Sequence, residues 1–369
     1  MIKSERILIS IWADPSNYIN LLFLINFFLA NNKNVILVCK EIEKKNDFFY
    51  FVKKDLKLKV IEIKNDGKYG YIKFFFKKIF ICKKFDISTI ISVNFISLFF
   101  SFFLKISKIK WVYYNFDFNI FDHFNLNNSI EKMIINKVDY IIVPSKSRLK
   151  LYKKVFNRKK NIFAVYNSFS KDFDIKNKIG IPTNLKNKNF CVRLGSFYKH
   201  HSLKNIALAT KYWKNNLYLV MAGKSYDNYF RKLKILKKKE NLDKLILFEN
   251  ISYRNWFGIL KKAKAGFALY DPVNTSHDLM GGTSQKLNNY IYAGIPSFVT
   301  KNKDFKKFND KYKTSILVDN HSIEDINLNL EKILKNKKLY KSIKKRNSKA
   351  FLNEFNFEKQ ISLVKNKIL

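Results

Sequence analysis

Short apolar runs of strand length alternate with helix-like runs along most of this chain. The first three, at residues 7–12, 18–30 and 35–39, follow the order strand, helix, strand. That order in so short a stretch is a βαβ unit, and βαβ units require a parallel sheet whose faces are covered by helices. The alternation therefore predicts an α/β fold.

The alternation is interrupted over residues 168–189, where polar residues, Gly180 and Pro182 replace the periodic pattern. We expect a linker here between two Rossmann-like domains that face a cleft. A length of 369 residues also fits two domains better than one. The predicted divisions are an N-terminal domain at 1–167, the linker at 168–189, a C-terminal domain at 190–350 and a C-terminal helix at 351–369. We expect that helix to cross back to the N-terminal domain.

Two glycines and two hydroxyl residues precede a short helix-like run between residues 281 and 296. Ser284 is suited to cap the start of that helix, and Gly294 is suited to end it. The N-terminus of a helix attracts anions, and Lys286 in the first turn adds positive charge that makes sense if it faces a phosphate. The stretch therefore predicts a phosphate site.

The formal net charge is +42, from 71 basic and 29 acidic residues. Such a charge suits nucleic acid, an anionic membrane or phosphorylated substrates. A second explanation is that the abundant Lys, Asn, Ile, Phe and Tyr have A/T-rich codons, so a biased genome raises the lysine content without any partner. Arginine, which base and phosphate readout favours, is scarce beside lysine. We therefore expect no nucleic-acid partner and retain peripheral contact with an anionic membrane.

Three cysteines, Cys39, Cys82 and Cys191, lie far apart in or beside apolar runs. An odd number without a Cys-x-x-Cys pair predicts buried, reduced thiols in a cytoplasmic protein. The apolar runs at 21–30 and 95–104 fall short of the roughly 20 residues that span a bilayer. We expect both to be buried helices, with shallow membrane contact by the phenylalanines of the second as the alternative.

Five stretches of the second half carry recognisable motifs. They are Leu194-Gly195-Ser196 with Lys199-His200-His201, 218–223, 248–253, 263–270, and Ser284-Gln-Lys-Leu-Asn-Asn-Tyr290 with Ala293-Gly-Ile-Pro296. In the first half, Glu131 and the run 138–145 are also familiar. Together these stretches resemble the retaining bacterial sugar transferases of group 1, or family 4, which have the GT-B fold. The last motif is the most specific of them.

Many members of that family carry two glutamates separated by seven residues in this last motif. Here the second would fall at Asn289 and the first near Gly281, and Asp278 is the nearest carboxylate. In the family the glutamates contact the donor sugar and its ribose, whereas Asn289 offers a neutral amide. Two interpretations stay open: an active transferase with altered donor contacts, or a catalytically degenerate GT-B protein.

The resemblance implies a site for a nucleotide-sugar donor. It implies that Lys199 and Lys286 stabilise the departing diphosphate, without a metal or other cofactor. The other donor-binding residues that it implies are Arg193, Gly195, Gly223, Ile251, Gly282, Thr283, Ser284 and Asn289. The structural alternatives are solvated surface lysines and, for Arg193, an arginine that merely ends a strand.

An acid or base that acts on the acceptor is expected at the carboxyl end of an N-terminal strand. Asp117 follows the run 111–114, where the family often has an acidic residue. Asp14 follows the first run and is predicted on the acceptor side, although a helix cap beside Pro15 is the alternative. A retaining outcome is implied by the resemblance alone.

The sequence thus indicates a metal-independent glycosyltransferase. We expect it to move a sugar from a nucleotide-sugar donor to a glycan or lipid-linked acceptor in bacterial surface polysaccharide or lipopolysaccharide synthesis. Its expected place is the cytoplasm, with peripheral contact at the inner face of the membrane. The rival classes are a degenerate sugar- or partner-binding module and a nucleic-acid-binding protein.

Overall fold

The computed structural model describes residues 5–64, 66–104, 108–116, 126–158, 160–173, 180–214, 216–225 and 228–369. The chain divides into two units. Unit 1 comprises Met1–Tyr166 with Gln360–Leu369, and unit 2 comprises Asn167–Lys359. The cleft that we expect between the domains stays a prediction.

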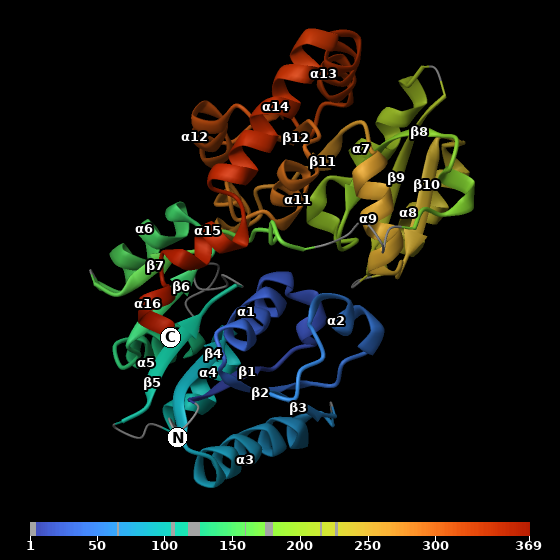
Figure 1. The fold of residues 1–369 in the computed structure, drawn as a ribbon. Helices are drawn as coiled ribbons and strands as arrows, with labels where there is room; N and C mark the ends of the chain where they lie inside the picture. The colour runs from blue at the N-terminus through green and yellow to red at the C-terminus, as the bar shows by residue number, and fades with distance from the viewer. Residues whose placement is uncertain are drawn as a thin grey trace. The chain divides into compact units, whose positions relative to one another are not determined.

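Unit 1 is built on a seven-stranded sheet in the order β3-β2-β1-β4-β5-β6-β7 (Figure 1). All neighbouring strands pair in parallel. The strands are β1 (Arg6–Ile11), β2 (Asn34–Lys40), β3 (Leu58–Ile63), β4 (Ile87–Val93), β5 (Lys110–Tyr114), β6 (Tyr140–Val143) and β7 (Ile162–Ala164). The order reverses between β1 and β4, as in doubly wound folds.

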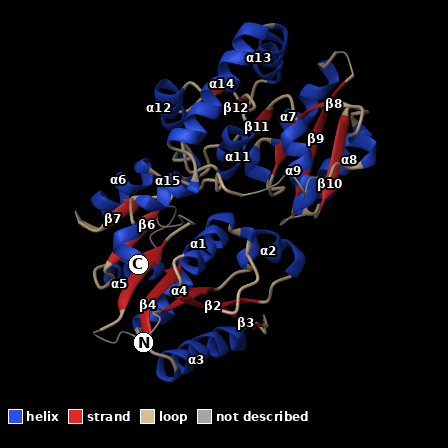
Figure 2. Ribbon diagram, in the orientation of Figure 1, coloured by secondary structure: helices blue, strands red, loops and turns tan. Residues whose placement is uncertain are grey.

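The helices of unit 1 cover both faces of this sheet, with α1 and α2 on one face and α3 on the other (Figure 2). They are η1 (Pro15–Asn17), α1 (Ile19–Ala30), α2 (Lys45–Phe51), α3 (Lys68–Lys84), α4 (Asn94–Phe102), α5 (Leu126–Ile135) and α6 (Lys146–Val155). Residues from strands and helices, among them Leu8, Val38, Phe74 and Ile141, form one buried apolar core. Burial of these side chains is the main stabilising contribution to the unit.

Unit 2 repeats the plan with a six-stranded parallel sheet in the order β10-β9-β8-β11-β12-β13. The strands are β8 (Asn189–Leu194), β9 (Leu217–Gly223), β10 (Leu245–Glu249), β11 (Gly266–Ala268), β12 (Ser297–Thr300) and β13 (Ser315–Val318). The order reverses between β8 and β11. Ligands of open α/β sheets bind outside the carboxyl ends of the strands at such a reversal.

The helices of unit 2 lie between and after these strands. They are η2 (Thr183–Leu185), η3 (Lys199–His201), α7 (Leu203–Ala209), η4 (Thr210–Tyr212), α8 (Tyr229–Lys239), α9 (Tyr253–Lys262), α10 (Thr275–Asp278), α11 (Gln285–Ala293), α12 (Lys303–Tyr312), α13 (Ile323–Lys335) and α14 (Lys337–Asn353). A second buried core, with Leu219, Phe267 and Ile326 among its members, holds them on the sheet.

The tail departs from the single helix that we expected. It forms α15 (Phe357–Ser362) and α16 (Lys365–Ile368), and its last ten residues belong to unit 1. The Gln360 side chain accepts a hydrogen bond from the Tyr166 amide at 2.9 Å, and Lys110 Nζ donates to the Leu369 carbonyl at 3.3 Å. The α/β class with two Rossmann-like domains is confirmed.

The sequence reading also missed α2 and α12, because each is a short helix dominated by charged and aromatic residues. Phe48 and Phe51, three residues apart in α2, are buried on one side of that helix. Phe305 and Phe308 are buried in the same way in α12. Two of the three cysteines, Cys39 and Cys191, are buried as expected, whereas Cys82 is only partly buried. Across the described residues, no helix combines the length and the apolar character needed to cross a membrane.

Candidate functional site

The candidate site lies in unit 2, at the carboxyl ends of β8 and β11. The loop after β8 brings Gly195, the loop after β11 brings Tyr270, and the start of α11 brings Ser284 and Lys286. Parallel strands place the loops that follow them at the same edge of the sheet, so these residues meet although they lie far apart in the sequence.

Two glycines allow the loops to approach one another. A Cβ atom at Gly223, the last residue of β9, would overlap the carbonyl oxygen of Gly195. Gly195 itself has a φ of +113°, and a Cβ there would lie 3.1 Å from Cε of Lys286. Both positions therefore need glycine, and the Lys286 side chain lies directly over the Gly195 loop. The Gly195 amide donates to the Ala222 carbonyl, so this amide is not available to a ligand.

The start of α11 is organised as the sequence predicts. The Ser284 side chain accepts a hydrogen bond from the Leu287 amide at 3.2 Å, and Gly294 ends the helix in the left-handed conformation. The hydroxyl groups of Tyr270 and Ser284 are 2.7 Å apart, which joins the loop after β11 to the helix start. The amides of Thr283 and Ser284 both donate to the Met280 carbonyl. Among the amides of the predicted donor-binding residues Gly282, Thr283 and Ser284, only that of Gly282 makes no hydrogen bond within the described part of the chain.

Lys286 is partly buried in the first turn of α11. Its Nζ atom lies 3.3 Å from the Tyr270 hydroxyl and 4.9 Å from the centre of the Tyr270 ring. Burial and the nearby Arg193 guanidinium hold the pKa of Lys286 well below its usual value. No salt bridge joins it to a carboxylate among the residues that the structure describes. A bound anion would supply the missing counter-charge.

Arg193 is only 1% exposed, and its side chain makes hydrogen bonds to other residues of the site. Its Nη1 donates to the Gly195 carbonyl at 2.6 Å, and its Nη2 donates to Nδ1 of His201 at 2.6 Å. Burial lowers the pKa of Arg193 to about 10. The structure therefore gives Arg193 a role that the sequence did not show: it holds the Gly195 loop and the His201 ring.

His201 is the functional candidate that the sequence reading overlooked. Its pKa is held well below the usual value by burial and by the charges of Lys286 and Arg193, so the ring is neutral. Nδ1 lies 2.6 Å from Nη2 of Arg193, which can only donate, and 3.2 Å from the Ser196 carbonyl; the shorter contact with Arg193 favours the tautomer whose proton is on Nε2. The ring packs edge-on against Tyr270, with centroids 5.2 Å apart. The adjacent pair His200-His201 in the loop after β8 was the available signal.

His277 completes a cluster of basic side chains. Burial, His200 and Lys286 lower its pKa, and the nearby Asp271 partly opposes them. The Asp271 carboxylate is already occupied, since it accepts hydrogen bonds from Ser202 and Asn320. We call Arg193, His201, His277 and Lys286 the basic cluster. Arg193, Lys286 and His277 each disfavour protonation of another member, whereas a bound anion would favour the protonated forms.

Several buried polar atoms around α11 have no partner in the described structure. They are the Thr283 hydroxyl oxygen, the Asn288 side-chain oxygen and Nδ1 of His277. The Asn288 amide nitrogen donates to the carbonyls of Asn167 and Gly282, both at 2.8 Å, and so fixes the glycine loop. Unsatisfied buried polar atoms are rare in native proteins and are often found at functional sites.

The positions of the two family glutamates differ in their surroundings. Asn289 is 3% exposed, and its oxygen accepts a hydrogen bond from Gln285 at 3.3 Å. The Gly281 amide donates to the Asp304 carboxylate at 2.7 Å, and a Cβ at Gly281 would lie 2.8 Å from that same carboxylate. The helix α12 therefore leaves no space for a side chain at 281, and it places a carboxylate there that no sequence motif indicated.

The other predicted residues lie outside this cluster. Lys199 is exposed in η3 and makes no side-chain hydrogen bond or salt bridge with other described residues, and Ile251 is partly buried after β10. Asp14 caps η1 by accepting from the Ser16 amide at 2.9 Å, and it also accepts from the Glu43 amide. Asp14 thus caps the helix, and its place on the acceptor side stays a prediction. Asp117 lies outside the described residues, and its role stays a prediction.

No group of three or more potential metal ligands occurs within the described ranges. One Asp-x-Asp spacing, the usual pattern of a metal pair, does occur at Asp172 and Asp174. Asp172 is exposed and its amide donates to the Ser170 hydroxyl at 3.2 Å, while Asp174 is not among the described residues. The expectation that no metal takes part stays a prediction.

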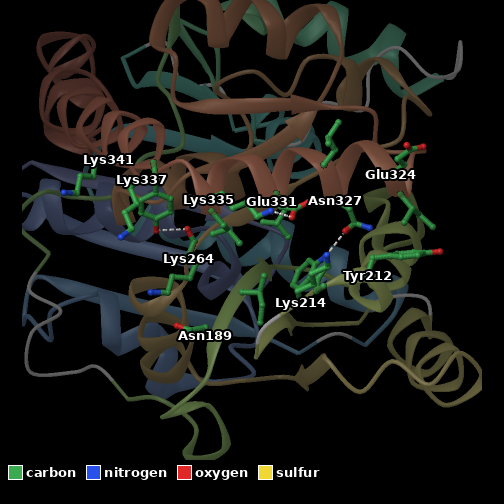
Figure 3. Close-up of a pocket in the computed structure, with 17 residues that line it drawn as sticks. Asn189, Tyr212, Lys214, Lys264, Glu324, Asn327, Glu331, Lys335, Lys337 and Lys341 are labelled. Atoms are coloured by element: carbon green, nitrogen blue, oxygen red, sulfur yellow. Dashed lines mark hydrogen bonds and ion pairs between the residues drawn. The ribbon is translucent and has the colours of Figure 1, made fainter.

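Unit 2 also contains a cavity of about 1220 Å³ at the opposite edge of the sheet (Figure 3). It lies between the first residues of β8 and β9, Asn189 and Leu217, and the helices α13 and α14. Trp213 donates to Asn327 at 2.9 Å and Tyr340 donates to the Lys264 carbonyl at 2.9 Å along its wall. A strand of six residues is about 20 Å long, so this cavity is separate from the basic cluster.

The fold defines a class of protein. Three solved structures match nearly the whole chain: sucrose-phosphate synthase from Thermosynechococcus elongatus (13% identity, TM-score 0.73, 98% of each chain), HepE of Anabaena in complex with UDP-glucose (10%, 0.77, 98% of each chain) and WaaG, a glycosyltransferase involved in lipopolysaccharide biosynthesis (12%, 0.67, 98% of this chain and 99% of that chain). At these identities the likeness shows the fold, which is GT-B.

The sequence of unit 2 matches a known family. Residues 173–350 match the family model of glycosyl transferases group 1. Residues 173–350, slightly less than half of the chain, therefore form a group 1 glycosyltransferase domain, and the fold of the chain is GT-B. A search of curated proteins finds no match. The basic cluster and the start of α11 lie inside the matched residues.

Proposed function

We propose that the protein transfers a sugar from a nucleotide-sugar donor whose diphosphate binds at the basic cluster. The observation that supports this proposal most strongly is the gathering of three basic side chains, Lys286, Arg193 and His201, with no carboxylate bound to any of them among the described residues. A diphosphate supplies two negative charges, and it gains further charge when the sugar departs. HepE, which has the same fold, binds UDP-glucose, so a uridine nucleotide is the first donor to test.

Lys286, His201 and Arg193 have three different roles in the proposed transfer. Lys286 takes up a proton when the diphosphate arrives and then stabilises the charge that grows on the leaving oxygen. The Nε2–H group of His201 donates a hydrogen bond toward the same region. Arg193 does not touch the ligand; it fixes the Gly195 loop and the His201 tautomer. Because these groups are held in place before the ligand binds, little reorganisation is needed during transfer.

We further propose that the acceptor is a glycan or lipid-linked glycan of bacterial surface polysaccharide or lipopolysaccharide synthesis. WaaG, a structural neighbour, acts in lipopolysaccharide biosynthesis, which supports this choice. Retention of anomeric configuration, independence of metal ions, and a place at the inner face of the cytoplasmic membrane belong to the same proposal. Asp117 is the proposed residue for acting on the acceptor, and Lys199 is proposed to approach the donor phosphates from η3.

The direct test is to incubate the protein with a panel of nucleotide sugars and to measure release of the free nucleotide diphosphate. The proposal expects hydrolysis or transfer with at least one donor, and a loss of that signal in Lys286→Met. The same assay with EDTA tests independence of metal. A folded protein that binds a donor and never releases a nucleotide would instead fit the degenerate class. Inertness and absence of binding across the whole panel would overturn the proposal.

A further inference from the structure

The helix α3 has two apolar faces, and the sheet covers only one of them. Gly70, Phe74, Lys78 and Ile81 point inward and are buried. The opposite face carries Tyr69, Ile72, Phe76 and Phe80, which are 72%, 51%, 61% and 52% exposed. Their spacing of three, four and four residues places them in one line along the helix.

The end of α4 extends this line of exposed side chains. Phe103 follows α4 directly and is 59% exposed. Its ring centroid lies 5.9 Å from that of the partly buried Phe75 on α3, so Phe103 lies beside this helix. We call Tyr69, Ile72, Phe76, Phe80 and Phe103 the aromatic ridge. Exposed apolar side chains are common singly, but a continuous ridge of this kind marks a surface that binds something.

Lysines border the aromatic ridge. The helix α3 has no acidic residue, and its exposed lysines are Lys68, Lys73, Lys77, Lys83 and Lys84. Lys73 is paired with Asp66 at 2.6 Å. The Nζ atoms of Lys77 and Lys84 each lie 5.5 Å from the centre of the Phe80 ring, so charge and apolar surface are interleaved.

This combination selects among partners. A nucleic acid would be attracted by the lysines but would leave the apolar ridge unpartnered on a convex helix surface. An anionic lipid surface accepts both, because aromatic rings enter the boundary between headgroups and acyl chains while lysines meet the phosphates. The 17 residues of α3 make a helix about 25 Å long, which can lie flat on a bilayer along its whole length.

We propose that the aromatic ridge and its lysines dock unit 1 on an anionic membrane surface. The biological role of this docking rests on the proposed function. A transferase held at the membrane surface would reach an acceptor that is anchored in the same membrane. The binding itself needs no donor and no catalysis. It can therefore fail or succeed independently of the transferase assignment.

The test is sedimentation of the full chain with vesicles of phosphatidylcholine alone and of phosphatidylcholine with phosphatidylglycerol. The wild type is expected to bind the anionic vesicles and to release them as salt is raised. Phe76→Ser with Phe80→Ser is expected to weaken binding by about tenfold or more, since it removes two inserted rings. Lys77→Gln with Lys84→Gln is expected to weaken it less, and mainly at low salt.

A matched control removes exposed leucines elsewhere. Leu328 and Leu352 are 64% and 61% exposed in unit 2, and Leu328→Ser with Leu352→Ser is expected to leave vesicle binding unchanged. Circular dichroism and thermal unfolding establish that each variant is folded. Equal binding by the ridge variant and the control would overturn the proposal. A ridge-dependent dimer in gel filtration, with no vesicle binding, would overturn it in favour of a second copy of the chain.

Donor binding, followed by thermal shift with nucleotide sugars in the same samples, separates the two proposals. Donor binding without vesicle binding would overturn only the proposal that the aromatic ridge docks on a membrane. Vesicle binding without donor binding would overturn the proposed function and support the docking proposal. The ridge variant is expected to keep its donor response, because the aromatic ridge belongs to unit 1 and the donor residues belong to unit 2.

Discussion

Two lysines, one in each unit, have pKa values lowered by burial, yet their surroundings are opposite. Lys78 in α3 is fully buried, and its Nζ donates to the Ser97 carbonyl at 3.0 Å and to the Ser101 hydroxyl at 2.6 Å. Among the described residues, Nζ of Lys286 makes one hydrogen bond, a long one of 3.3 Å to the Tyr270 hydroxyl, and the charge of Arg193 lies nearby. Neither lysine is paired with a carboxylate within the described structure.

The difference separates a structural cation from a ligand-binding one. The hydrogen bonds of Lys78 are satisfied by oxygens of the fold, and its pKa of about 7 reflects burial. The surroundings of Lys286 add more positive charge instead of removing it, so its interactions are completed only when an anion arrives. A lowered pKa alone does not identify a functional site; the missing partner does.

The largest expected effect is on catalysis. Lys286→Met should lower kcat/KM by about 10²–10³, because it removes a charge that stabilises the leaving diphosphate. Lys78→Met should leave kcat/KM unchanged, since it lies in the core of the other unit. Steady-state kinetics with the best donor measure both. A similar fall in kcat/KM in both variants would contradict the claim that only Lys286 binds the ligand.

The second effect is on stability, and it concerns Lys78. Its folded-state pKa is about 7 against 10.5 for an unperturbed lysine, so the unfolded chain binds more protons between these values and stability rises with pH across this window. From pH 7 to pH 10 this contribution amounts to about 3 kcal/mol. Urea unfolding should show that rise in the wild type and not in Lys78→Met. A rise of equal size in both proteins would contradict the account.

Glu131 gives a stability effect of opposite sign within unit 1. Burial raises its pKa from 4.5 to about 7, although Tyr113, Tyr152 and Asn115 donate hydrogen bonds to it. The folded state then binds more protons between these pH values. The contribution of Glu131 to the free energy of unfolding is therefore greatest below pH 4.5 and falls as the pH rises to 7. The loss from pH 5 to pH 8 should be about 2 kcal/mol. Glu131→Gln, measured by urea unfolding at both pH values, should lack this loss.

The smallest expected effect is at Asn289. Its side chain is buried and already bonded to Gln285, so Asn289→Ala should weaken donor affinity by about tenfold at most, the value of one neutral hydrogen bond. Isothermal titration with the donor measures the change. A loss as large as that of Lys286→Met would show that the amide replaces the family glutamate in full.

Much of the fold follows from local pattern. The alternation of apolar runs predicts both parallel sheets, and the cap at Ser284 and the stop at Gly294 depend only on neighbouring residues. The expected phosphate stretch is found at the carboxyl end of the sheet. These features are predictable because their physical causes are contained in a few consecutive residues.

The missed parts of the site depend on residues that the fold alone brings together. The bond from Arg193 to His201 requires the turn of the Gly195 loop, and the carboxylate of Asp304 reaches Gly281 only because α12 packs there. Tyr270 looks like the last residue of a strand in the sequence, yet its hydroxyl bonds Ser284 and contacts Lys286. No spacing in the sequence encodes these contacts.

Proton uptake on donor binding tests the central claim most directly. Isothermal titration of a nucleotide sugar near pH 8, in buffers of different ionisation enthalpy, counts the protons taken up by the complex. The wild type should take up more protons than Lys286→Arg, whose guanidinium is already charged, while Lys78→Met should match the wild type. Equal proton uptake by the wild type and Lys286→Arg would contradict the claim that Lys286 becomes charged by the arriving diphosphate.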